Sequence, residues 1–243
     1  MMPRVLTVAG SDSGGGAGIQ ADLKTIALLG GYGMSVLTAL TAQNTLGVKG
    51  IHEVPADFVG LQMDAVMADI GVDAMKTGML SSPAIIRMVS RKIRQYGISR
   101  VVVDPVMVAK GGARLLFAEA EETLKKELLP LAQILTPNIP EAEVLAQRKI
   151  RGVEEMKEAA RRIRRLGPRN VLIKGGHLRG DAVDVLFDGR RFFTFSSPRL
   201  SSAHTHGTGC TLSAAMALEL ARGCSPEEAV EKAKSFITSA IRF

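Results

Sequence analysis

Tryptophan is absent from the 243-residue sequence, and all aromatic side chains together make up only 4% of it. Proteins that bind single-stranded nucleic acid stack bases on aromatic rings, so we do not expect that function. Only two cysteines are present, which argues against a disulfide framework and favours the cytoplasm. No apolar run reaches the roughly 20 residues that span a bilayer, and no leader precedes the first apolar run. We therefore expect a cytoplasmic protein without a membrane partner.

The net charge of +7 has one concentrated source, a group of arginines and lysines between residues 148 and 169. Such a cluster suits either a nucleic-acid patch or a solvated helix face. Glu154 and Glu155 begin the predicted helix and arginines end it, which the helix dipole favours. Glu158 also lies four residues before Arg162, a stabilising spacing. We therefore expect a solvated helix and no nucleic-acid partner.

Short apolar runs typical of buried strands alternate with helical patterns along nearly the whole chain. The predicted strands lie at 5–9, 34–40, 72–79, 101–103, 132–136 and 171–173. The predicted helices lie at 19–29, 58–67, 83–96, 119–129, 139–145, 153–166, 211–220 and from 226 onward. Asp188-Gly189 between two apolar runs predicts one late hairpin. The sequence therefore predicts a single α/β domain over residues 1–243, with a doubly wound, mostly parallel sheet and helices on both faces.

The stretch 204–210, which runs from His204 to Cys210, directly precedes a helical pattern rich in alanine and leucine. Gly207 and Gly209 flank Thr208, so the backbone there can bend tightly and approach a ligand. The free N–H groups at a helix start attract anions, phosphate above all, and the same position favours the thiolate form of Cys210. This pattern predicts phosphoryl transfer with Cys210 as a candidate base. The alternative is a glycine turn into a buried helix, with Cys210 as a small core residue.

A second glycine-rich loop, 10–18, follows the first predicted strand. It fits neither a P-loop, because Lys24 comes too late, nor the dinucleotide fingerprint, because Ile19 replaces the third glycine. We expect a small ligand to approach its backbone, because nine residues are long for a plain connection. Gln43, at the end of the next predicted strand, offers a donor and an acceptor to a heterocycle, although a surface amide is the default alternative.

Two carboxylates lie where open α/β sheets bind ligands. Asp104 ends a buried strand, at the edge where ligands bind, although it would equally serve as a cap of the next turn. Asn138 and Glu141 stand three residues apart at a helix start. Their spacing suits a helix cap, and it equally suits oxygen groups around Mg²⁺ and phosphate.

Together these pieces resemble the ribokinase-like superfamily, and more closely the hydroxymethylpyrimidine/phosphomethylpyrimidine kinases of thiamin biosynthesis. The resemblance covers essentially the whole chain and rests on the joint order of six motifs. They lie at 9–22 (AGSDSGGGAGIQAD), 40–45 (LTAQNT), 76–79 (KTGM), 103–107 (VDPVM), 136–141 (TPNIPE) and 206–210 (HGTGC).

The resemblance implies ATP-dependent phosphorylation of a pyrimidine alcohol and then of its monophosphate, with Mg²⁺, in a homodimer. It implies an anion hole and base at Gly207, Thr208, Gly209 and Cys210. It implies a pyrimidine pocket at Gly10, Ala17, Asp22, Gln43, Met79 and Val106. It implies nucleotide contacts at Asn138, Lys174 and Thr208, and Mg²⁺ organisation at Asp104 and Glu141. A short Gly/His-rich tail follows the last helix in many members, and we expect this chain, which ends at Phe243, to lack it.

Two other functions fit the same motifs. Pyridoxine/pyridoxal kinases belong to the same superfamily, and some share the Gly-Thr-Gly-Cys motif. A catalytically idle nucleotide or vitamin sensor is the alternative from another class, and the intact Asp104, Glu141 and Cys210 argue against it.

Overall fold

The structure, a computed structural model, describes residues 1–107, 118–176, 178, 180–200, 202 and 205–242. His204, at the start of the predicted phosphate loop, lies outside the described residues. Within them, no helix is both long enough and apolar enough to cross a membrane.

One mixed sheet forms the centre of the molecule, with strand order β10-β9-β8-β7-β6-β5-β1-β2. Within this sheet β2, β1, β5, β6, β7 and β8 are parallel to one another, whereas β9 pairs antiparallel with both β8 and β10. Their bounds are β1 Arg4–Ala9, β2 Tyr32–Leu37, β5 Ala74–Thr77, β6 Val101–Val103, β7 Ile134–Leu135, β8 Asn170–Ile173, β9 Ala182–Phe187 and β10 Phe192–Ser197. The predicted doubly wound sheet and its late hairpin, β9–β10, are confirmed.

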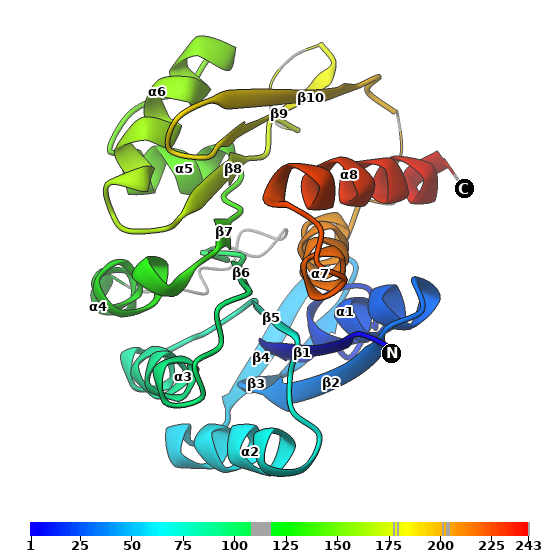
Figure 1. The fold of residues 1–243 in the computed structure, drawn as a ribbon, viewed down its shortest axis with the longest axis vertical. Helices are drawn as coiled ribbons and strands as arrows, with labels where there is room; N and C mark the ends of the chain where they lie inside the picture. The colour runs from blue at the N-terminus through cyan, green and yellow to red at the C-terminus, as the bar shows by residue number, and fades with distance from the viewer. Residues whose placement is uncertain (108–117, 177, 179, 201, 203–204, 243) are drawn as a thin grey trace.

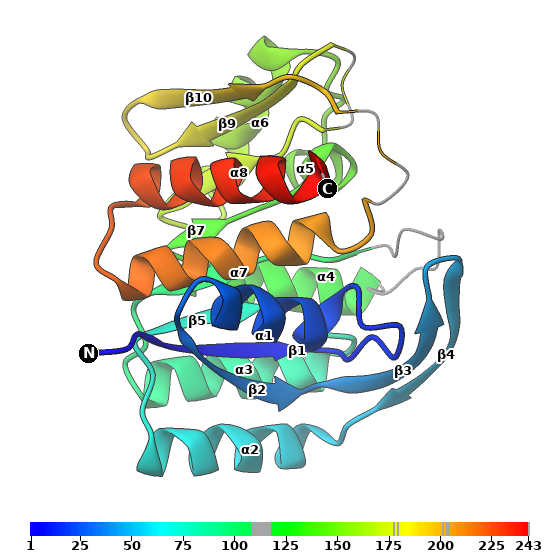
Figure 2. The same cartoon turned by 90° about the vertical axis from the view of Figure 1, so that its right-hand side faces the viewer.

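Helices cover both faces of this sheet (Figures 1 and 2). One face carries α2 Ala56–Asp69, α3 Pro83–Gln95, α4 Ala118–Thr123, α5 Ile139–Ala146 and α6 Val153–Arg164. The other face carries α1 Gly18–Leu28, α7 Thr208–Ala221 and α8 Pro226–Arg242. On α6, Glu158 contacts Arg161 and Arg162 at 3.6 and 3.5 Å, as expected for a solvated helix.

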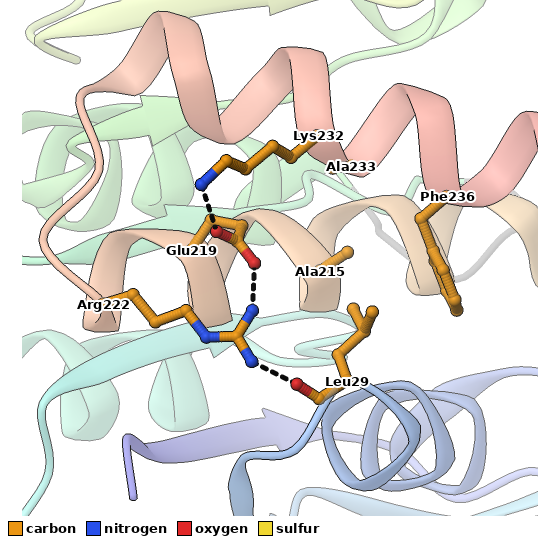
Figure 3. A pocket seen from close by; sticks show the side chains of 7 residues that line it. All are labelled: Leu29, Ala215, Glu219, Arg222, Lys232, Ala233 and Phe236. Carbon is orange, nitrogen blue, oxygen red and sulfur yellow. Dashed lines mark hydrogen bonds and ion pairs between the residues drawn. The ribbon is translucent and has the colours of Figure 1, made fainter. Parts of the chain in front are cut away.

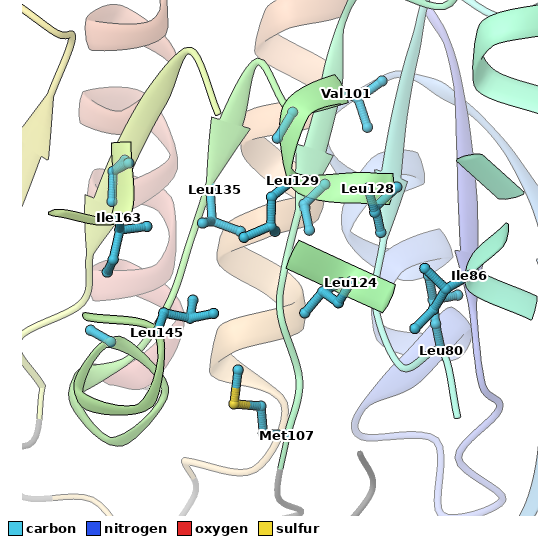
Figure 4. Packing of buried hydrophobic residues seen from close by; sticks show 14 of the residues in the cluster. Leu80, Ile86, Val101, Met107, Leu124, Leu128, Leu129, Leu135, Leu145 and Ile163 are labelled. Carbon is cyan, nitrogen blue, oxygen red and sulfur yellow. The ribbon is translucent and has the colours of Figure 1, made fainter. Parts of the chain in front are cut away.

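The strand side chains alternate between two apolar layers, which explains why the strands are apolar throughout. Val101 and Val103 pack with α2, α3 and α5, whereas Val102 packs with α7 and α8. Figure 4 shows part of the larger layer, including Val101, Leu128 and Leu135. A strand buried on both faces has no solvent-facing side, so it appears in sequence as an unbroken apolar run.

Three features differ from the sequence predictions. The run predicted as one strand, 34–40, ends at Leu37 in β2 and then enters a separate hairpin of β3 Ala39–Asn44 and β4 Gly47–Glu53. Most of β4 is exposed, so an apolar pattern could not reveal it. The helix predicted at 119–129 is α4 continued by a π-helical turn, Leu124–Leu128, and a 3-10 turn, Leu129–Leu131.

Candidate active site

A cavity of about 1120 Å³ opens at the carboxyl ends of the central parallel strands. Its walls come from the segments after β1, β5, β6, β7 and β8, from the start of α7 and from the end of α8. This is the sheet edge at which open α/β folds bind ligands. All predicted site residues except Asp22 line this cavity.

The start of α7 forms one wall of the cavity. Gly207 precedes the helix with φ of +79°, and a Cβ there would lie 1.7 Å from the Gly16 carbonyl oxygen. Only glycine fits that position, because a side chain would meet both backbone strain and a collision. The first N–H groups of α7 have no partner within the helix and therefore suit an anion.

Lys174 and Asp104 stand next to this helix start. The Lys174 ammonium lies 2.9 Å from Asp104 Oδ1, which also accepts a hydrogen bond from Thr136 Oγ1 at 3.1 Å. A Cβ on Gly209 would approach Lys174 Nζ to 3.5 Å and Asp104 Oδ2 to 3.8 Å. Burial opposes the charge on Asp104, but Lys174 and Lys76 hold its pKa below the ordinary value. The site thus places a cation and an anion beside the anion-binding backbone.

Asn138 and Glu141 form a complete capping box at the start of α5. The Asn138 side chain accepts from the Glu141 N–H at 2.9 Å, and Glu141 Oε2 accepts from the Asn138 N–H at 2.8 Å. Burial and the nearby Asp104 raise the pKa of Glu141 to about 7, although Lys174 opposes the shift. Asn138 and Glu141 therefore form the predicted helix cap, and both also line the cavity.

Cys210 lies in the first turn of α7, and the predicted thiolate is wrong for the structure described here. Burial, together with the carboxylates of Asp22 and Asp104, raises the pKa of Cys210 to about 11, although Lys76 opposes the shift. The desolvation of the thiol outweighs the positive end of the helix. Cys210 is therefore a neutral thiol near pH 7 and serves as a weak donor or acceptor.

Sequence reasoning assigned no role to Lys76, which is fully buried in β5 and lines the cavity. Its ammonium lies 2.8 Å from Asp22 Oδ2, and the Thr7 hydroxyl donates to the same oxygen at 2.6 Å. Asp22, predicted in the pyrimidine pocket, instead lies behind the cavity wall as the partner of Lys76. The signal that could have revealed Lys76 was its charge, because it lies in a four-residue strand that is buried.

Five of the residues that the resemblance assigns to the pyrimidine pocket line the cavity. They are Gly10, Ala17, Gln43, Met79 and Val106. Gln43 Oε1 accepts from the Thr41 hydroxyl at 3.1 Å, and a Cβ on Gly10 would lie 3.3 Å from Met79 Sδ. In the glycine-rich loop 10–18, the backbone N–H groups of Gly14, Gly16 and Ala17 donate to the Asp12 carboxylate.

A smaller cavity of about 350 Å³ lies between α1, α7 and α8 (Figure 3). Its charged groups neutralise one another, because Glu219 pairs with both Arg222 and Lys232, and Arg222 also donates to the Leu29 carbonyl. These satisfied charges leave little for a ligand, so the larger cavity is the candidate site.

Known proteins resemble this chain over nearly its full length. A bifunctional thiamine biosynthesis protein, ThiED, of Geobacter sulfurreducens is 62% identical over 98% of the chain, which spans 49% of that relative. The hydroxymethylpyrimidine/phosphomethylpyrimidine kinase of Bacillus subtilis is 49% identical over 98% of the chain and 89% of its own length. An ADP complex of Bacillus subtilis pyridoxal kinase superposes with a TM-score of 0.92 at 43% identity, over 99% of this chain and 92% of that one.

The ribokinase-like fold is common to this chain and the kinase structures that it matches. The family model for phosphomethylpyrimidine kinase matches residues 12–243, which include the helix-start glycines, the Asp104–Lys174 pair and Glu141. On this match and on the high identity to its relatives, the chain belongs to the phosphomethylpyrimidine kinase family.

Proposed function

We propose that the chain transfers phosphate from ATP to 4-amino-5-hydroxymethyl-2-methylpyrimidine and then to the resulting monophosphate, giving the diphosphate. One observation carries the proposal. The α7 start, Lys174, Asp104 and Glu141 share a single cavity with the acceptor-side residues around Gln43 and Met79. A phosphate and an acceptor can therefore occupy the same enclosed space.

Phosphoryl transfer needs alignment and charge neutralisation more than covalent chemistry. Lys174 is held by Asp104 within reach of the helix start, so its charge can face a phosphate bound at the N–H groups of α7. Thr208, in the first helical position, lines the cavity on the nucleotide side, as does Asn138. These groups would bind the nucleotide phosphates and orient the transferring one.

Asp104 and Glu141 fit a Mg²⁺ ion. Mg²⁺ is usually held by one or two carboxylates together with substrate phosphates, and no cluster of three or more His, Cys, Asp or Glu residues suited to a metal occurs in the described part of the chain. Burial, together with the nearby carboxylate of Asp104, raises the pKa of Glu141 to about 7, and a divalent cation bound there would favour the ionised form. Bound there, Mg²⁺ would neutralise phosphate charge.

Cys210 would act on the acceptor hydroxyl as a neutral thiol. Cys210 lines the cavity together with Lys76 and Asp104, and we propose that it lies between the bound phosphate and the acceptor. With a pKa of about 11, it is better suited to orient the hydroxyl than to remove its proton early. This assignment is compatible with a loose transition state, which demands little from a base.

The acceptor preference is tested by competition. Both 4-amino-5-hydroxymethyl-2-methylpyrimidine and pyridoxal, at equal concentration, are incubated with Mg-ATP and followed by mass spectrometry. The Gln43 amide can satisfy ring nitrogen and amino groups, so the pyrimidine monophosphate should form first and the diphosphate later. The pyridoxal kinase resemblance and the adaptable Met79 favour weaker turnover of pyridoxal. Formation of pyridoxal phosphate without any pyrimidine diphosphate would instead show that the chain is a pyridoxal kinase.

We also propose a homodimer that works in the cytoplasm. Exposed large apolar side chains support the dimer: Leu40 and Leu46 lie on the β3–β4 hairpin, and Phe58 and Leu61 lie on α2. Light scattering at micromolar concentration should give twice the mass of one chain. A single-chain mass across the tested concentrations would refute the dimer.

A further inference from the structure

We propose that Asp12 and His206 are positioning residues. They hold the phosphate-binding loop, which leads into α7, at a fixed position relative to the acceptor pocket. The inference rests on the proposed kinase function and adds residues to which sequence reasoning assigned no role. Neither residue is needed to contact the transferring phosphate. Their effect would pass through the backbone of the two loops that they join.

Asp12 lies in the glycine-rich loop 10–18 and is only 1% exposed. Its carboxylate accepts from the backbone N–H groups of Gly14, Gly16 and Ala17 at 2.8, 3.1 and 2.8 Å. The His206 Nε2 atom lies 2.8 Å from the same carboxylate, across 194 residues of sequence. Asp12 therefore sets the shape of its own loop and reaches the residue directly before Gly207.

The charge state of the pair follows from this geometry. Burial opposes ionisation of Asp12, but the hydrogen bonds from His206, Gly14 and Ala17 hold its pKa below the ordinary value. An ionised carboxylate only accepts hydrogen bonds, so His206 Nε2 carries the hydrogen and donates it. This is a charge-assisted hydrogen bond in a site shielded from water, the stronger kind of contact.

Backbone packing supports the link between the loops. The ideal Cβ position of Gly207 lies 1.7 Å from the Gly16 oxygen, and that of Gly16 lies 2.6 Å from the His206 ring. On its other side the Asp12 loop is tied to β3, because the Ser13 hydroxyl donates to the Gln43 carbonyl and accepts from the Gln43 N–H. A shift of His206 would therefore move the helix start relative to Gln43.

The expected consequence is a loss of alignment rather than of binding. A displacement of about 1 Å between reacting groups can cost on the order of 100-fold in rate. Nucleotide affinity should change little, because no hydrogen bond among the described residues joins Lys174, Asp104 or Glu141 to this pair. The predicted signature is a fall in kcat with a nearly constant KM for ATP.

Substitution of His206 with two side chains of similar size tests the role. His206→Gln keeps an N–H donor that can reach Asp12, whereas His206→Leu does not. We expect His206→Leu to lower kcat about 10- to 100-fold with KM for ATP almost unchanged, and His206→Gln to recover most of the loss. Equal kcat values for the two variants, or a loss confined to KM, would overturn the proposal.

A matched control separates positioning from general stability. Asp73→Asn removes a carboxylate that pairs with Arg4 at 2.7 Å, at the opposite end of β1 and β5 from the cavity. It should lower the melting temperature and leave kcat unchanged. Asp12→Ala removes the acceptor and should lower kcat at least as much as His206→Leu, and the double variant should lose little more than Asp12→Ala alone, because the same hydrogen bond is already absent. Additive losses would contradict the coupling.

One readout does not depend on activity. In protein labelled with ¹⁵N-histidine, the His206 Nε2–H should exchange slowly with water, and Asp12→Ala should abolish that protection. The exposed His52 on β4 provides the fast-exchanging reference. Fast exchange at His206 would refute the pair. Slow exchange in a wild-type enzyme that phosphorylates no pyrimidine would leave the pair intact and reject the proposed function instead.

Discussion

Replacement of Lys76 by methionine should destabilise the protein more than most single substitutions. Lys76 and Asp22 are both fully buried, and their side chains form an ion pair at 2.8 Å. Methionine has a similar shape but no charge, so the Asp22 carboxylate would keep only the hydrogen bond from Thr7. Its other oxygen, Oδ1, already has no hydrogen-bond partner. Removing one member of a buried ion pair typically costs about 3–5 kcal/mol.

That loss should appear directly in denaturation experiments. For a domain of this size, about 3–5 kcal/mol corresponds to a fall of roughly 6–20 °C in melting temperature. Urea unfolding of wild type and Lys76→Met at pH 7 gives the difference in free energy. The double variant Asp22→Asn/Lys76→Met, which removes both charges, should recover more than half of it.

The pH dependence of the stability difference between wild type and Lys76→Met provides a second, independent test. Burial already raises the pKa of Asp22, and Lys76 counteracts that rise, so the pKa of Asp22 should be higher still in Lys76→Met. A buried carboxyl group with a raised native pKa destabilises the fold least when it is protonated. The free-energy cost of burying it therefore shrinks as pH falls. The gap between wild type and Lys76→Met should therefore narrow from pH 8 to pH 5. A cost below about 1 kcal/mol, as for a surface pair, and independent of pH would refute this reasoning.

Three further predictions concern the cavity. Gly207→Ala should lower the free energy of unfolding by about 2 kcal/mol or more and abolish nearly all turnover, because the backbone is strained for alanine and its Cβ would collide with the Gly16 oxygen. Near-normal stability in urea unfolding together with near-normal turnover in steady-state assays would count against this. Cys210→Ala should depress turnover while nucleotide binding, measured by calorimetry, survives, and Cys224→Ala should be near neutral as its control. Because the pKa of Cys210 is about 11, kcat should show no thiol ionisation between about pH 6 and 9, and a step there that Cys210→Ala removes would contradict the neutral thiol. Asp104→Asn should raise the Mg²⁺ concentration needed for half-maximal turnover, whereas an unchanged Mg²⁺ requirement with a large fall in melting temperature would give Asp104 a structural role.

The sequence predicted the central sheet well because its strands are buried on both faces. Val101–Val103 and Val171–Ile173 are unbroken apolar runs, and each appears as a strand in the structure. The β3–β4 hairpin escaped prediction because its strands are largely exposed and its turn, Asn44–Gly47, lacks the usual Asn-Gly pair. Local pattern therefore identified buried elements and missed a solvated one.

The sequence predicted which residues form the site better than it predicted their ionisation states and ion pairs. Motif order identified Asp104 and Glu141, the resemblance implied a role for Lys174, and these three residues line one cavity. The prediction that Cys210 is a thiolate was wrong, because a helix start is visible in the sequence but the burial of a thiol is not. The partnership of Lys76 with Asp22 spans 54 residues, and no local pattern contains it.

The contact between the two glycine loops also bears on how the protein is made. Asp12 and His206 are 194 residues apart, so a growing chain has produced most of its sequence before they can meet. Contacts between distant residues form slowly, because a long loop must close first. During synthesis, the sheet strands β1, β2 and β5 to β8 can begin to pair before α7 exists. The cavity should consequently be among the last parts of the molecule to assemble, and a ribosome-bound chain that ends before α7 should bind no nucleotide there.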